Sequence, residues 1–151
     1  MKLKLAIVGS RAFTNENYVL KVVNRYITEV GKDHLTIVSG GCPDGADMLG
    51  KKIALDLGLE YVEFPPAHRF HNQYCILPAK VYNKPYHVKN YFERNSQVAA
   101  HCDHLVAFVI KGVRCNGTMD TFNKAKKLAK EVILFEEEID KPQFYCGNYE
   151  D

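Results

Sequence analysis

Glycine turns that follow short apolar segments limit most strongly what this chain can fold into. The longest of them separates the apolar residues 35–38 from an amphipathic helical pattern, and it reads Ser39-Gly40-Gly41-Cys42-Pro43-Asp44-Gly45-Ala46-Asp47. Adjacent glycines let the backbone turn tightly and approach a ligand without a side chain in the way. The helix that follows offers free N–H groups and the positive end of its dipole. Two similar turns, Gly9-Ser10-Arg11 and Asn116-Gly117-Thr118, occur elsewhere, so we expect a ligand that carries an anionic group.

Apolar segments alternate with helical patterns along the chain. Strands are expected over residues 5–8, 35–38, 59–64, 105–110 and 132–135. Helices are expected from Thr14 or Asn15 to Gly31, from Asp44 to Gly58, over 91–101, and from Gly117 with Ala129 on its inward face. This alternation predicts an α/β fold, a Rossmann-like open parallel sheet of about five strands with helices on both faces. Right-handed crossovers place the three turns together at the carboxyl edge of that sheet.

The chain length predicts one domain with a tail. A chain of 151 residues with 46% hydrophobic residues can bury a core of its own. We expect a nucleotide-binding domain over 1–135 and a C-terminal tail over 136–151. Residues 67–90 lack a clear periodicity, and so long an irregular insertion in a small domain is usually functional.

Composition limits the compartment and the partners. The 20 basic and 18 acidic residues leave a net charge of +2, which argues against a nucleic-acid partner. The sequence shows neither a signal peptide nor an apolar run near the ~20 residues of a membrane helix. Five cysteines without a CxxC pair favour a reducing, cytoplasmic location. No metal or cofactor is expected, since the spacing of His68, His71 and Cys75 matches no established site and Cys42 has no identifiable histidine partner.

We number the turns along the chain, so that Gly9-Ser10-Arg11 is the first, residues 39–47 are the second and Asn116-Gly117-Thr118 is the third. The first turn departs from two common nucleotide-binding motifs. Arg11 stands where GxGxxG requires glycine, and the chain contains no GxxxxGK[ST]. Arg11 can instead form a forked contact with phosphate or remain solvated. Asp47 can contact a sugar hydroxyl or, with Asp44, resemble a capping box; both readings stay open. Arg94 and Asn95 lie near the start of the helix after the irregular insertion, where side chains can reach the crevice.

Four blocks, in this order, resemble the SLOG superfamily and, more narrowly, its YspA-like branch. They are Gly9-Ser10-Arg11 with Phe13, Ser39-Gly40-Gly41 with Gly45-Ala46-Asp47, Arg94-Asn95, and Gly117-Thr118 with Thr121. The resemblance spans about residues 3–135. It implies a Rossmann-like sheet that binds nucleotides or nucleotide-derived ligands through these blocks and Asn116. The superfamily includes the LOG phosphoribohydrolases and the DNA-processing protein DprA, and its members are often dimers or larger, so a homo-oligomer is also expected.

Two departures from the family pattern bear on activity. The LOG enzymes use a PGGxGTxxE block, and here Thr121 occupies the position of its glutamate while Asp120 lies one residue early, rotated by about 100° on a helix. Arg94 matches the arginine partner, so Arg94 and Asp120 are the candidate catalytic residues. YspA-like members carry a short glycine-rich segment before the Arg-Asn pair, whereas this chain has residues 67–90. That segment and its flank supply aromatic rings that can stack on a base, such as Tyr82, Tyr86 and Tyr91.

Three functions are therefore predicted, in order of preference. The first is a sensor or sequestering module for a nucleotide or nucleotide-derived small molecule. Its phosphate would lie on the N–H groups after Gly41 and Gly117, assisted by Thr118 and Arg11. The alternative is a phosphoribohydrolase that releases the base from a nucleoside 5′-monophosphate. The second alternative is a DprA-like module for nucleic-acid processing.

Overall fold

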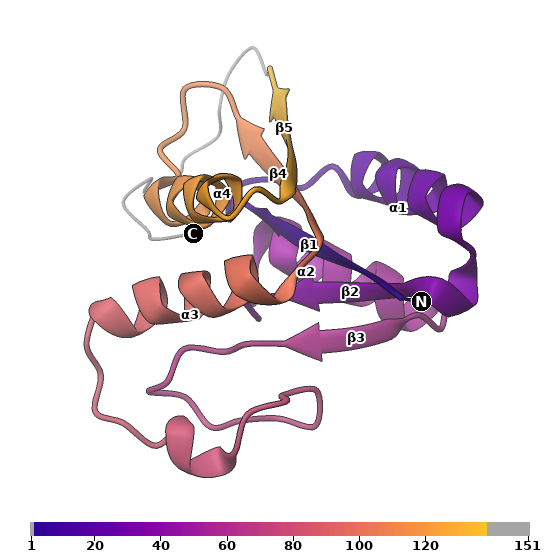
Figure 1. The fold of residues 1–151 in the computed structure, drawn as a ribbon. Coiled ribbons are helices and arrows are strands. Elements are labelled where there is room, and N and C mark those ends of the chain that lie inside the picture. The colour runs from indigo at the N-terminus through magenta and orange to yellow at the C-terminus, as the bar shows by residue number, and fades with distance from the viewer. Residues whose placement is uncertain (1, 139–151) are drawn as a thin grey trace.

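Five parallel strands form one sheet in the order β3-β2-β1-β4-β5 (Figure 1). The computed structural model describes residues 2–138. The strands are β1 (Leu3–Gly9), β2 (Leu35–Ser39), β3 (Glu60–Glu63), β4 (His104–Ile110) and β5 (Glu131–Glu137). The helices are α1 (Glu16–Val30), α2 (Gly45–Asp56), α3 (Lys89–His101) and α4 (Asn116–Lys127), with short 3-10 helices η1 (Lys32–His34) and η2 (Ala79–Val81). The predicted α/β, Rossmann-like fold is confirmed.

Alternation along the central strand explains why helices cover both faces of the sheet. Leu5 and Ile7 of β1 pack in one apolar cluster with residues of α1 and α2. Ala6 and Val8 pack in a second cluster with residues of α3 and α4. Successive side chains of a strand point to opposite faces, so a strand buried on both sides reads as a continuous apolar run. The run in β1 is the signal that made this strand predictable.

The register of the sheet sets the position of the glycine turns. Gly9, the last residue of β1, pairs with Phe108 of β4. A Cβ on Gly9 would lie 2.2 Å from the carbonyl oxygen of Phe108, so only glycine fits there. The strand order reverses between β1, which leads to β2 and β3, and β4, which leads to β5. Open α/β sheets bind ligands at such a reversal, outside the carboxyl ends of the strands.

Helix boundaries differ from the prediction at several points. At the start of α1 the prediction of Thr14 or Asn15 is confirmed for Asn15, whose Oδ1 accepts the N–H of Tyr18 at 3.2 Å. The prediction for Ala129 is wrong: α4 ends at Lys127, and Ala129 has a φ of 62° outside the helix. The N–H of Leu128 donates to carbonyl oxygens of residues 124–126 in the last helical turn. These bonds end the helix before Ala129.

An irregular segment over residues 64–88 connects β3 to α3 and contains only η2 as regular structure. It forms the lobe below β3 and α3 in Figure 1. Of the predicted tail, residues 139–151 lie outside the described residues, and the division into a domain and a tail stays a prediction. None of the helices between residues 2 and 138 is long and apolar enough to cross a membrane.

Phe108 offers a test of the core. It is fully buried, and its ring lies 5.2 Å from that of Phe13 and 5.4 Å from that of Phe135. We expect Phe108→Ala to lower the free energy of unfolding by about 3–5 kcal/mol, because the cavity left behind cannot fully close. Urea denaturation measures this loss. Leu55→Ala, at a side chain that is 43% exposed, is the control and should change it by less than about 0.5 kcal/mol.

Candidate functional site

The first and second glycine turns are in direct contact at the carboxyl edge of the sheet. The N–H of Ala46 donates to the carbonyl oxygen of Ser10 at 3.3 Å. Gly45 has a φ of 70°, and a Cβ there would lie 2.1 Å from the same oxygen and 2.5 Å from Cα of Arg11. Glycine at this position therefore lets the start of α2 close against the backbone that carries Arg11.

Arg94 and Asn95 on α3 connect the second turn to the third. Nη1 of Arg94 donates to the carbonyl oxygen of Gly40, and its Nε donates to Oδ1 of Asn95 at 3.1 Å. Nδ2 of Asn95 donates to the carbonyl oxygen of Gly117 at 3.3 Å. Both side chains are buried. The three glycine turns and the Arg94-Asn95 pair, predicted from separate parts of the sequence, are thus connected by hydrogen bonds. We call this group, residues 9–11, 39–47, 94–95 and 116–118, the turn cluster.

The guanidinium of Arg94 is a buried positive charge beside the turns. Burial lowers its pKa, and the neighbouring carboxylate of Asp47 acts in the opposite direction. An arginine pKa starts so high that the group stays protonated at neutral pH. A Cβ on Gly40 would lie 2.6 Å from Nη1, so the absence of a side chain at residue 40 lets this charge reach the backbone.

The second turn uses two of its N–H groups internally. Ser39 Oγ accepts the N–H of Gly41 at 3.1 Å, and Asp47 Oδ2 accepts the N–H of Cys42 at 3.3 Å. The N–H of Cys42 already has an acceptor, so a phosphate after Gly41 would have to replace the carboxylate of Asp47 there. The expected phosphate position stays a prediction. The capping box expected of Asp44 and Asp47 is not formed as predicted: Asp44 makes no side-chain cap for α2, and the carboxylate of Asp47 reaches back to the N–H of Cys42 instead. A contact of Asp47 with a sugar hydroxyl stays a prediction.

The third turn leads into α4 without a side-chain cap. Its N-cap residue, Cys115, forms no side-chain cap for α4. Thr118 is fully buried, and its Oγ1 has no hydrogen-bond partner among residues 2–138. Thr121 Oγ1 donates to the carbonyl oxygen of Gly117 at 3.1 Å, so it does not compete for the N–H groups at the start of the helix. Uncapped N–H groups at a helix N-terminus bind anions readily.

Asp120, a candidate catalytic acid, is held by two neighbours. Its Oδ2 accepts from Nδ2 of Asn95 at 3.2 Å and pairs with Nζ of Lys124 at 2.9 Å. Arg94, the other catalytic candidate, is similarly occupied by Gly40 and Asn95. Both side chains serve structural contacts, and catalysis by either stays a prediction.

Glu63 is a site residue that the sequence did not single out. It is 4% exposed at the end of β3, and it accepts a hydrogen bond from Tyr61 Oη at 2.6 Å. Nζ of Lys51 lies 3.4 Å from its carboxylate, and the side-chain amide of Asn72 donates to it. A Cβ on Gly41 would lie 2.8 Å from the Glu63 side chain. The only available signal was its place in the sequence, a carboxylate at the end of an apolar strand.

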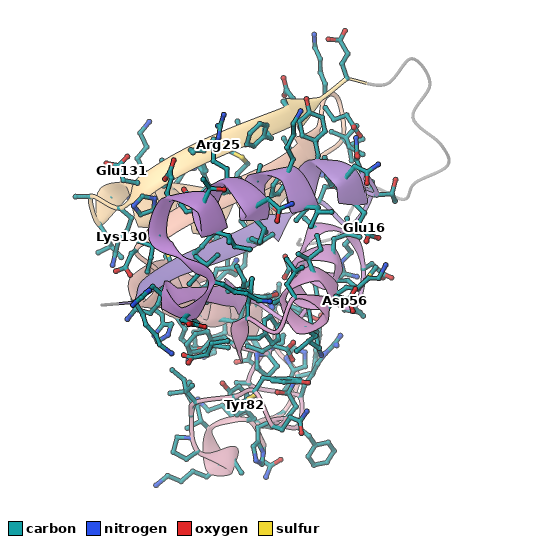
Figure 2. The ribbon with its side chains drawn as sticks, turned by 90° about the vertical axis from the view of Figure 1, so that its right-hand side faces the viewer. Glu16, Arg25, Asp56, Tyr82, Lys130 and Glu131 are labelled. Atoms are coloured by element: carbon teal, nitrogen blue, oxygen red, sulfur yellow. The ribbon has the colours of Figure 1, made fainter. Side chains whose placement is uncertain are left out.

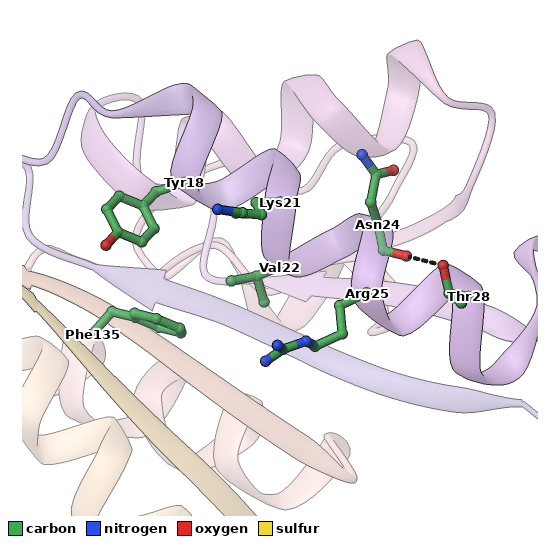
Figure 3. A pocket seen from close by; sticks show the side chains of 7 residues that line it. All are labelled: Tyr18, Lys21, Val22, Asn24, Arg25, Thr28 and Phe135. Atoms are coloured by element: carbon green, nitrogen blue, oxygen red, sulfur yellow. Dashed lines mark hydrogen bonds between the residues drawn. The ribbon is translucent and has the colours of Figure 1, made fainter.

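A separate cavity of about 420 Å³ lies between α1 and β5, away from the turn cluster (Figure 3). Its lining includes Tyr18, Arg25 and Phe135, none of which belongs to the predicted site. Tyr18, in the first turn of α1, is 43% exposed and lines this cavity. Within the described part of the chain, no three His, Cys, Asp or Glu side chains gather as a metal-binding group.

Arg94→Lys tests the connection between the turns. A lysine lacks the planar fork that reaches Gly40 and Asn95 together. We expect it to lower the free energy of unfolding by about 1–3 kcal/mol, since a buried carbonyl loses a charged donor. Chemical denaturation measures the change, and Arg25→Lys on the exposed face of α1 is the matched control. Equal stability of the two variants would show that the contacts to Arg94 contribute nothing.

Cys42 tests whether the second turn activates a thiol. Burial raises the pKa of Cys42 to about 11, and the charge of Asp47 adds to this effect. Below that pH the thiol is protonated, so about one molecule in a thousand carries a thiolate at pH 8. We expect iodoacetamide to modify Cys42 far more slowly than a small free thiol at pH 8, and the rate to rise toward pH 11. Rapid modification at pH 7, read by peptide mass spectrometry, would contradict this.

Comparison with known proteins gives a family and a related fold. A family model described as DNA recombination-mediator protein A matches residues 1–149. Among solved structures, DNA processing protein A from Helicobacter pylori, studied for its unique single-stranded DNA binding mode, superposes with a TM-score of 0.65 at 19% identity. The match covers 93% of this chain and 68% of that one. None of the curated proteins matches.

These findings overturn the preferred functional prediction. A sensor or sequestering module for a small nucleotide is wrong, because the family and the structural neighbour both point to DNA processing, the second alternative. The exclusion of a nucleic-acid partner is wrong for the same reason. It rested on the net charge of the whole chain, which says nothing about how that charge is distributed. The chain belongs to the DNA recombination-mediator protein A family, within the wider group that the sequence blocks indicated.

Proposed function

We propose that this protein binds single-stranded DNA at the turn cluster and acts in DNA processing. The observation that carries the proposal is the convergence of three glycine turns around the buried charge of Arg94, next to the uncapped N-terminus of α4. Family membership supports it, as does the single-stranded DNA binding described for the H. pylori protein of the same fold. Placement in the YspA-like branch is a finer prediction supported by the sequence blocks alone.

The start of α4 is the first phosphate site in this proposal. Thr118 has a buried hydroxyl without a partner in residues 2–138, and it would donate a hydrogen bond to an oxygen of the bound phosphate. The N–H groups of Gly117 and Thr118 lie at the positive end of the same helix, which favours the negative charge. Contacts of this kind read the sugar-phosphate backbone, so we expect binding with little sequence preference.

Arg11 supplies the second contact. It follows β1 at the carboxyl edge of the sheet, and the close approach of Gly45 fixes its backbone. A guanidinium can bind two phosphate oxygens at once, which suits a strand that presents a phosphate at every nucleotide. No bond-breaking step belongs to the proposal, because the family glutamate is replaced by Thr121, whose hydroxyl is hydrogen-bonded to the carbonyl oxygen of Gly117.

Thr118→Val tests the first phosphate site, because it should raise the stability of the free protein and lower its affinity for DNA. Valine has a similar shape and removes a hydroxyl that is buried without a partner, so the free protein should gain roughly 1 kcal/mol of stability. Binding of a labelled oligo-dT should weaken, because the phosphate loses that donor. Thermal melting and fluorescence anisotropy measure the two effects. A variant that is more stable and binds with unchanged affinity would remove Thr118 from the site.

Arg11→Ala tests the second contact. We expect weaker binding of oligo-dT and a salt dependence whose log–log slope is smaller by about 0.7, the value for one phosphate contact on a single strand. Arg25→Ala, in the lining of the α1–β5 cavity and outside the turn cluster, is the control and should leave both unchanged. Nucleoside monophosphates, at the same concentration of nucleotide as the oligo-dT, should compete poorly with it for the protein. Failure of the wild-type protein to bind oligo-dT at low salt would refute the proposed function.

A further inference from the structure

We propose that residues 64–88 extend the single-stranded DNA site as a stacking surface, on which the exposed rings of Phe70 and Tyr86 hold bases. The inference rests on the proposed function and deepens it: the turn cluster holds phosphates, and this segment holds bases. It assigns a role to the irregular lobe of Figure 1, which the family resemblance left unexplained.

The charge of the segment is the first observation. Residues 64–92 contain no aspartate or glutamate, so all 18 acidic residues lie elsewhere in the chain. The same stretch carries Arg69, Lys80, Lys84 and Lys89. A surface without acids and with several cations attracts a polyanion, although the whole chain is nearly neutral. The partner that fits it is therefore an extended anionic polymer.

Exposed aromatic rings are the second observation. Phe70 is 84% exposed and Tyr86 is 66% exposed, whereas Tyr82 is 1% exposed. The expectation that Tyr82 stacks on a base is therefore wrong: its ring packs inside the lobe, where Figure 2 shows it among other side chains. Aromatic rings that remain in solvent beside cations are the feature that single-strand binding proteins use to stack bases.

A row of rings links the turn cluster to the exposed Tyr86. The guanidinium of Arg94 lies 5.7 Å from the ring centre of Tyr91. The ring of His68 lies 5.0 Å from Tyr91 and 4.7 Å from Tyr86. The row thus begins at the residue that holds Gly40 and ends in solvent. A strand with its phosphates at the turns would have a continuous apolar path for the bases that follow.

Both ends of the segment are fixed to the body of the protein. At the start, the side chain of Asn72 donates to the buried Glu63, and the N–H of Glu63 donates to the carbonyl oxygen of Tyr74 at 3.1 Å. At the end, Nδ2 of Asn90 donates to the carbonyl oxygen of Pro85 at 3.2 Å. These contacts hold the exposed rings in place before a ligand arrives, which reduces the ordering cost of binding.

The chain contains no tryptophan, so a single introduced one reports on its own surroundings. In Phe70→Trp and Tyr86→Trp we expect oligo-dT to quench the tryptophan fluorescence, because a stacked base lies against the indole. Tyr18→Trp, in the α1–β5 cavity, is the control and should not be quenched. An oligonucleotide with abasic sites keeps the phosphates and should bind without quenching.

Affinity gives the second arm of the test. Phe70→Ala and Tyr86→Ala should each weaken oligo-dT binding roughly fivefold to 100-fold, with Tyr18→Ala as control and melting curves to confirm that the variants fold. Wild-type affinity in both alanine variants, or quenching that persists with the abasic oligonucleotide, would overturn the stacking role while leaving phosphate binding intact. If the wild-type protein binds no single-stranded DNA, the proposed function fails as well.

Discussion

The buried guanidinium of Arg94 is the interaction on which the geometry of the site depends. It reaches the carbonyl oxygen of Gly40 directly and that of Gly117 through Asn95, so one α3 residue pair sets the spacing of two turns that are distant in sequence. The first turn joins them through the contact of Ser10 with α2. Burying a charge is costly unless its hydrogen bonds are made. The carbonyl oxygen of Gly40 and the side chain of Asn95 accept those bonds, and the carbonyl groups of Gly40 and Gly117 are thereby held in one arrangement.

Much of the fold could be predicted from the sequence, because a parallel sheet covered on both faces leaves a simple pattern: apolar segments, glycine turns and amphipathic helices in alternation. The helix ends were harder to predict, since Ala129 continues the apolar period of α4 although the helix already ends at Lys127, two residues before it. The sequence indicated which residues lie near the site, but not which of them contact one another. The sequence suggested a local role for Asp47 but not that its partner is the N–H of Cys42. It also did not show that Ser39 accepts the N–H of Gly41, or that Glu63 packs behind Gly41.

The functional prediction failed because glycine turns indicate only that a phosphate can bind. They do not show whether that phosphate belongs to a free nucleotide or to a strand of DNA. What distinguishes the two lies outside the turns. A free nucleotide needs one enclosed pocket, whereas a strand needs a surface that continues beyond the first phosphate. The acid-free stretch over residues 64–92 provides such a continuation, yet averaging the charge over 151 residues conceals it.

The glycines of the turn cluster differ in which atoms an added Cβ would meet, and this determines which substitutions can be tolerated there. At Gly9 and Gly45 the obstacle is backbone, the carbonyl oxygens of Phe108 and Ser10, which no substitution elsewhere can remove. At Gly40 the obstacle is the side chain of Arg94. Positions 40 and 94 are therefore linked: a larger residue at one becomes tolerable when the other shortens. Among divergent relatives, positions 9 and 45 should stay glycine, while positions 40 and 94 should change as a pair.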